Sequence, residues 1–210
     1  MLGGNRPFVR ALRRALRARI PGLRLARSTM PSSARLVLLI ALLAASPAAA
    51  GDAPVRYRVA FPAPEHHYAQ VEVTFADVPA GALEVHMSRS SPGRYAVHEF
   101  AKNVFDLRAF DGAGRELAPA RPSASRWDVA GHDGTVRIVY KVFGLHVDGT
   151  YLAIDASHAH MNMPATLLWA RGFEARTARI AFDPPRHSRW RAATQLFPTD
   201  DPWTFTAPNF

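Results

Sequence analysis

The sequence contains no cysteine, so neither disulfides nor thiolate metal ligands can contribute to the folded protein. Its uninterrupted apolar run, Leu36–Ala45, has ten residues, whereas a membrane-spanning helix needs about 20. Acidic residues are absent from residues 1–50, which hold nine arginines. The part of the chain after residue 50 must therefore be stabilised by its own apolar core.

The positive charge belongs to the first 50 residues. The formal net charge is +9, but residues 51–210 hold 17 Lys+Arg against 17 Asp+Glu. This body therefore carries no basic field that would attract phosphates, which argues against a nucleic-acid-binding protein.

The leader has the order of a secretory signal peptide. Arg35 precedes the apolar run, and Ser46–Ala50 ends in an Ala-x-Ala pattern. We expect residues 1–50 to be a basic leader with a signal-peptide helix, cleaved after Ala50, with Met30 as an alternative start. An Arg-rich presequence or a surface-binding amphipathic helix is the competing interpretation. Residues 51–210 are then one periplasmic or secreted domain, with no stable membrane anchor after cleavage.

The body alternates apolar and polar residues with a period of two, as strands do. Gly and Pro residues occur at short intervals and separate these segments. One helical turn is expected around His98–Asn103. The pattern predicts an all-β fold, an antiparallel β-sandwich with one short helical turn. The expected strands are Val55–Phe61, Ala69–Phe75, Leu83–Met87, Phe105–Ala109, Trp127–Val129, Val136–Val142, Tyr151–Asp155, Thr166–Ala170 and Thr177–Phe182.

The densest cluster of specific residue types is Ser90–Val104, which combines a Pro-Gly turn, aromatics and charges. With other matching segments it resembles the N-terminal domain of the glycyl aminopeptidases, metallopeptidase family sixty-one. His98 stands where that family is expected to have a longer basic residue. The other segments that carry the resemblance are Tyr57–Pro62, His66–Tyr68, Trp127, Val136–Val142, Ala153–His158, Trp190–Thr194 and Phe205–Phe210.

The resemblance implies a domain that precedes a zinc catalytic domain and a PDZ domain. In that family zinc is held by an H-E-x-x-H helix. The nearest string here, His98–Lys102, has Lys in place of the second His. We therefore expect a noncatalytic β-domain without a cofactor, which has no activity alone. It would be a fragment or a stand-alone partner that frames a substrate cleft, with a catalytic metallopeptidase and a peptide substrate as partners.

The candidate site residues are a set of charged, amide and aromatic side chains for a substrate or domain interface. A structural alternative pairs Arg94 with Glu99, Asp106 or Asp155 in a buried ion pair. The candidates are Arg94, Tyr95, Glu99, Asn103, Asp155 and His158.

Two further hypotheses remain open. His158 and His160 lie two residues apart, a spacing that on a strand would place both on one side, so they could share a metal ion with a third ligand from His66, His67 or Asp155. From another class of function, the chain could be a stand-alone periplasmic peptide- or glycan-binding module. Trp169 and Trp190 would then form its platform.

Overall fold

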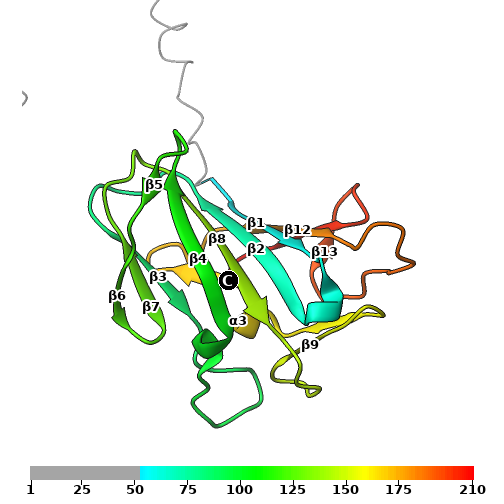
Figure 1. The fold of residues 1–210 in the computed structure, drawn as a ribbon. Coiled ribbons are helices and arrows are strands. Elements are labelled where there is room, and N and C mark those ends of the chain that lie inside the picture. Colours follow the sequence, from blue (N-terminus) through cyan, green and yellow to red (C-terminus); the bar gives the residue numbers. More distant parts are fainter. Residues whose placement is uncertain (1–52) are drawn as a thin grey trace, which may run out of the picture. The chain divides into compact units, whose positions relative to one another are not determined.

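The computed structural model describes residues 53–210 (Figure 1). The signal peptide and cleavage site expected within residues 1–50 lie outside the described residues. Within the described part, no helix is both long and apolar enough to span a membrane.

An eight-stranded sheet forms one layer of the domain, in the order β13-β14-β12-β1-β2-β8-β4-β5. Its long strands are adjacent in Figure 1, where β4, β8, β2 and β1 cross the view together. The strands are β1 (Val55–Ala60), β2 (Tyr68–Phe75), β4 (Val104–Asp111), β5 (Glu116–Leu117), β8 (Val136–Phe143), β12 (Ala178–Asp183), β13 (Phe197–Pro198) and β14 (Thr204–Ala207).

A smaller sheet of four strands lies behind the first, and a separate hairpin flanks both. The order of the four strands is β11-β3-β7-β6, and β9 pairs with β10 alone in the hairpin's two-stranded sheet. The bounds are β3 (Leu83–Met87), β6 (Ala120–Ser123), β7 (Arg126–Val129), β11 (Leu168–Ala170), β9 (Leu152–Ile154) and β10 (Ala159–Met161). The helical turns are η1 (Pro64–His66), η2 (Phe100–Asn103) and α3 (Met163–Thr166).

The core lies between the two sheets, because alternate residues of the long strands face inward. In β8 the alternate residues Val136, Ile138, Tyr140 and Val142 are all fully buried. They share one apolar cluster with residues of the smaller sheet such as Leu168. Burial of this apolar surface is the main contribution to stability.

Buried tyrosine hydroxyls join the two layers. The Tyr57 hydroxyl donates to the Leu168 carbonyl at 2.9 Å. The Tyr140 hydroxyl donates to the Thr166 carbonyl at 2.8 Å and accepts from the Leu168 N–H at 3.0 Å. Backbone groups in the centre of the core are thereby satisfied.

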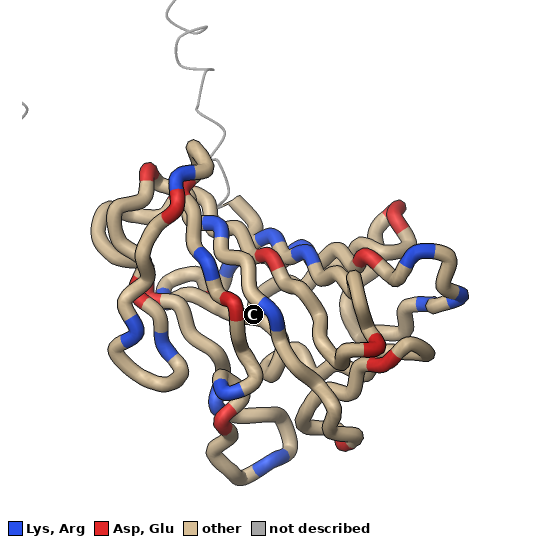
Figure 2. The backbone as a smooth tube through the Cα atoms, in the orientation of Figure 1, with Lys and Arg blue, Asp and Glu red and all other residues tan. Residues whose placement is uncertain are grey.

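Charges of both signs are interleaved over the domain (Figure 2). On the outer face of the large sheet, Arg137 contacts Glu72 at 3.0 Å and Lys141 contacts Asp106 at 2.9 Å. This mixture agrees with the zero net charge of residues 51–210.

The structure differs from the predicted antiparallel sandwich at one strand pair. β1 and β12 run parallel, from Val55 opposite Ala178 to Ala60 opposite Asp183, so the large sheet is mixed. Two strands far apart in sequence need no tight hairpin, so a local pattern does not determine their relative direction.

The helical content was also underestimated. η2 lies within the predicted turn, but η1 and α3 were not expected, and Thr166 belongs to α3 rather than to a strand. The sequence pattern missed β5, β6, β10, β13 and β14, which are short and lack a sustained apolar alternation.

Candidate functional site

Two neighbouring loops form one end of the domain, and we call loops 88–99 and 144–151 the loop pair. The first follows β3 and the second follows β8. Asn162, just before α3, joins them: its amide nitrogen donates to the Ser91 hydroxyl at 3.0 Å and to the Thr150 carbonyl at 2.6 Å. Arg94 and Asp148 contact each other across the loops at 3.9 Å.

Local hydrogen bonds shape the first loop. The Arg94 N–H donates to the Ser91 carbonyl at 3.1 Å, and Gly93 adopts a φ of 75°. The Pro92-Gly93 pair suits this turn, because Pro presets one φ and Gly tolerates the positive one. The His98 N–H closes the loop on the Arg89 carbonyl at 2.8 Å.

The second loop is held by Asp148. Its carboxylate accepts the N–H groups of Thr150 and Tyr151 at 2.7 and 2.9 Å. These backbone hydrogen bonds, the Thr150 bond first, lower the pKa of Asp148, and the nearby His146 and Arg94 contribute.

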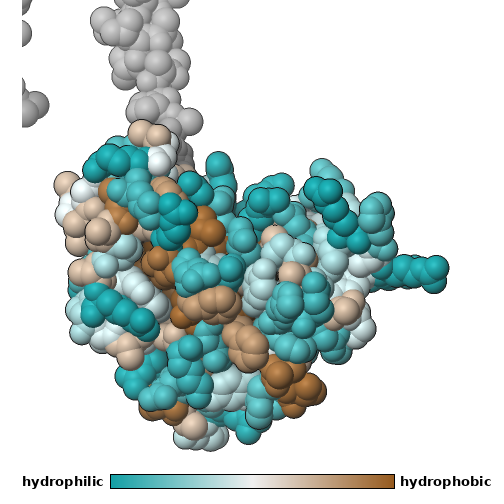
Figure 3. Space-filling view, viewed as in Figure 1, coloured by the Kyte–Doolittle hydropathy of each residue, from teal (hydrophilic) through white to brown (hydrophobic). Residues whose placement is uncertain are grey.

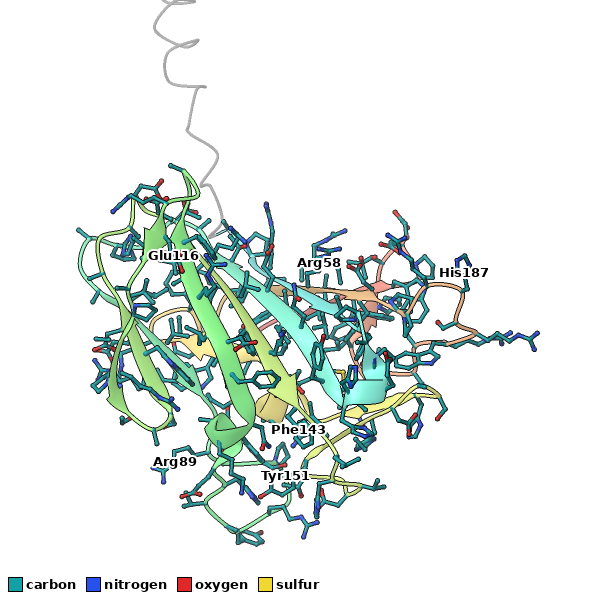
Figure 4. The ribbon with its side chains drawn as sticks, in the orientation of Figure 1. Arg58, Arg89, Glu116, Phe143, Tyr151 and His187 are labelled. Atoms are coloured by element: carbon teal, nitrogen blue, oxygen red, sulfur yellow. The ribbon has the colours of Figure 1, made fainter. Side chains whose placement is uncertain are left out.

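An aromatic cluster anchors both loops to the core. The Phe100 ring is fully buried, and the His98 ring stacks on it at a centroid distance of 4.9 Å. Tyr151 meets Phe100 edge-on at 5.3 Å, and its hydroxyl lies 3.3 Å from His98 Nδ1. Figure 4 shows Tyr151 and Arg89 at the same end of the domain.

The loop pair exposes four large apolar side chains: Tyr95 and Val97 from the first loop, Leu145 and Val147 from the second. Val147 is 83% exposed. Apolar residues also reach the surface at this lower end of Figure 3. Exposed apolar groups on adjacent, hydrogen-bonded loops are typical of an interaction surface.

A groove of about 650 Å³ adjoins the loop pair at Pro92 and Gly149. It runs past β10 and α3 to β14 and the segment 190–197. Aromatic side chains form part of its walls. The aromatic residues lining it are Phe61, Phe182, Trp190, Phe197 and Trp203.

The structure divides the predicted site residues between two places. Arg94, Tyr95 and Glu99 lie on the loop pair, where Glu99 is exposed just before η2. Asn103 is the last residue of η2. Asp155 and His158 lie in another connection, the turn between β9 and β10.

The predicted alternatives for the Arg94 ion pair are wrong. Arg94 is paired with Asp148, and both side chains are partly exposed. Asp106 contacts Lys141 instead, and Asp155 is engaged within its own turn. Tyr95 is fully exposed, so the aromatics of this segment are not all buried. Sequence spacing could not reveal Asp148, because it comes from a distant loop.

Asp155 closes the hairpin turn. Its carboxylate accepts the Ser157 hydroxyl at 2.6 Å and the N–H groups of Ser157 and His158 at 2.7 and 3.0 Å. The hydroxyl hydrogen bond is the largest cause that lowers the pKa of Asp155, to about 2. The Asp155 carboxylate thus acts as a turn-forming group.

Among the described residues, no third ligand is arranged beside His158 and His160. His158 Nδ1 lies 3.3 Å from the Asp155 carboxylate, and His67 Nδ1 lies 2.6 Å from the Ile154 carbonyl. Among residues 53–210, no group of three or more His, Asp or Glu side chains is arranged to hold a metal ion.

The two tryptophans proposed as a shared platform lie in different places. Trp190 lines the groove and meets Phe61 at a centroid distance of 5.1 Å. Trp169 is on β11, where it stacks on His86 at 4.7 Å.

Sequence reasoning also missed Asn162, the residue that joins the loops. Pro164 was an available signal, because Pro near the first helical position indicates that a helix begins there.

A solved structure has a similar fold. An aminopeptidase N family protein from Idiomarina loihiensis has a TM-score of 0.68 at 21% identity over 74% of this chain. This chain spans only 27% of that protein. A zinc metallopeptidase of family M1 from Deinococcus radiodurans gives a TM-score of 0.39 at 14% identity, over 74% of this chain and 38% of its own. No curated protein matches the chain significantly.

A family model described as the Peptidase M61 N-terminal domain matches residues 56–210. The match confirms the resemblance inferred from Ser90–Val104 and the flanking segments. It covers nearly all of the described residues. The chain therefore belongs to the Peptidase M61 N-terminal domain family.

Proposed function

We propose that residues 53–210 are the noncatalytic β-domain of an exported metallopeptidase of the M61 type. In this proposal the loop pair packs against a catalytic chain and frames one side of its substrate cleft. The catalytic chain supplies zinc and the groups that activate water, and this domain supplies shape and contact surface.

The exposed apolar side chains of the loop pair are the observation that carries this proposal. Tyr95, Val97, Leu145 and Val147 leave large apolar surfaces in water. Covering them with a partner is favourable by about 25 cal/mol per Å² of apolar area. Soluble monomeric proteins rarely expose large apolar side chains together on two adjacent loops.

The anchoring of the loops supports the same conclusion. Asn162 and the Arg94–Asp148 contact hold one loop against the other, and the Phe100 cluster fixes their bases. A preorganised surface loses less conformational entropy on association than mobile loops would. This arrangement suits a surface that must place a cleft wall accurately.

Reconstitution tests the proposal. The full chain is mixed with an M61 catalytic domain prepared without its own N-terminal domain, and zinc-dependent hydrolysis of glycyl and alanyl anilides is measured. We expect no hydrolysis by the chain alone, and a higher kcat/KM of the catalytic domain when the chain is added.

A charge introduced on the loop pair by substitution tests whether these loops contact the catalytic domain. Val147→Asp should reduce the stimulation about tenfold, because a carboxylate would be buried against apolar surface. Ala120→Asp, on the exposed outer strand β6, is the matched control and should retain the stimulation. Hydrolysis by the chain alone, or equal effects of the two variants, would refute the proposal.

A further inference from the structure

The hydrogen bonds of β9 show which way the backbone N–H and C=O groups of β9 and β10 point. The Ile154 N–H donates to the Gly144 carbonyl at 2.9 Å, and the Leu152 carbonyl accepts the His146 N–H at 2.8 Å. Both groups thus point away from β10. Because backbone groups alternate along a strand, those of Ala153 point toward β10, where Ala153 is opposite His160.

The same alternation leaves one edge of β10 open. The N–H and C=O groups of Ala159 and Met161 point away from β9. Within residues 53–210, no hydrogen bond reaches these four groups. Ala159, His160 and Met161 line the groove beside the loop pair, so β10 forms part of the groove wall.

The rest of the groove complements an extended chain. Trp190 and Trp203 provide apolar wall area for the side chains of a bound strand. Arg191 and His160 are the basic groups in the lining, and the described residues that line the groove include no Asp or Glu. The groove therefore favours a neutral or acidic ligand over a basic one.

We propose that the groove binds an extended, neutral or acidic peptide segment of a partner polypeptide by strand addition to β10. The partner segment pairs with Ala159 and Met161, two residues apart, through four backbone hydrogen bonds. An extended backbone presents alternating donors and acceptors at that spacing, which favours a peptide over a glycan. This pairing is independent of whether the loop pair contacts a catalytic chain.

Backbone methylation of the ligand tests the pairing on the unaltered full chain. The probe is a fluorescein-labelled, acetylated and amidated peptide, Val-Thr-Glu-Ile-Ser-Asp, and its affinity is measured by fluorescence polarisation. Two further versions carry N-methyl groups on alternate residues, in opposite phases. We expect one phase to lose at least about tenfold in affinity and the other to bind like the parent, because only one set of N–H groups faces β10.

Protein variants test the edge and its charge. Ala159→Pro removes one outward N–H while leaving the β9 ladder intact, and should weaken binding about tenfold. Arg191→Glu should weaken binding of the acidic probe. The matched control is Arg186→Glu, which reverses an exposed charge in the same connection between β12 and β13 but outside the groove lining.

The outcomes decide between strand addition and other contacts. No binding up to about 1 mM, equal loss from both methylation phases, or tighter binding of a lysine-substituted probe would overturn the proposal. The methylation result stands even if Ala159→Pro fails to fold.

Discussion

Gly144 lies where β8 ends and the second loop begins, and it closely approaches β9. A Cβ at this position would clash with the Leu152 side chain and lie 3.0 Å from the Leu152 carbonyl. Gly144 also accepts from the Ile154 N–H at 2.9 Å, so the backbone has little freedom to retreat. The absence of a side chain permits this contact.

We therefore predict that Gly144→Ala lowers the free energy of unfolding by about 1–3 kcal/mol, as overpacking does. Urea denaturation measures the loss. Gly149→Ala is the control, because a Cβ there would have nothing within 4 Å. Equal stability of the two variants would contradict the close packing at Gly144.

The buried hydroxyl of Tyr140 is a second case in which a single residue contributes to the free energy of unfolding. Tyr140→Phe leaves the Leu168 N–H and the Thr166 carbonyl without their partner. We predict a loss of about 1–3 kcal/mol in the free energy of unfolding. Tyr57→Phe removes a single bond, to the Leu168 carbonyl, and should cost less, about 0.5–1.5 kcal/mol.

The same tyrosines predict an alkaline limit to stability. Burial raises the pKa of Tyr140 well above its ordinary value of 10.0, and that of Tyr57 also rises. The folded state therefore holds these protons more tightly than the unfolded state. The two tyrosines therefore make their full contribution to the free energy of unfolding below pH 10.0. This contribution falls as the pH rises above that value. Denaturation at a series of pH values should show this fall, with a shallower slope for Tyr140→Phe.

At the scale of the element, the β9–β10 hairpin depends on the charge of Asp155. Its pKa is lowered to about 2 from 3.8, first by the Ser157 hydroxyl. A depressed pKa contributes stability that is present above pH 3.8 and is lost as the pH falls toward 2.

Asp155→Asn should therefore lower the melting temperature at neutral pH and remove part of its decline between pH 3.8 and about 2. Thermal unfolding followed by circular dichroism across this range measures both effects. Asp200→Asn, at an exposed position, is the control. An unchanged acid profile in Asp155→Asn would show that the turn does not need the charge.

Elements differ in how well a local pattern predicts them. β2 and β8 were predicted closely, because their inward apolar residues recur at every second position of an eight-residue strand. β6 is exposed throughout, and only its pairing with β7 makes it a strand. Its residues carry no periodic signal that could have been read beforehand.

At the scale of the whole molecule, the expected export is tested by the mature N-terminus. Ala48 and Ala50 have the small side chains that a signal peptidase requires. We predict that the exported protein begins at Gly51, and that Ala50→Arg blocks this processing. Mass spectrometry of the extracytoplasmic fraction measures the mass, and retention of residues 30–50 in the unaltered protein would contradict the prediction.

The candidate site was only partly predictable. The Ser90–Val104 segment drew attention to Arg94 and Tyr95, which do lie on the loop pair. The partner Asp148 and the joining residue Asn162 come from other parts of the chain. No spacing rule connects such residues, because folding alone brings them together.

The amino-acid sequence by itself determined the strand-rich body, its apolar core faces and its family, because side-chain periodicity and residue motifs are local properties of the chain. The tertiary structure decided the parallel pairing of β1 with β12, the joining of the two loops and the open edge of β10. These features depend on which distant segments meet when the two sheets bury their apolar faces, and that choice is made by the packing of the whole domain.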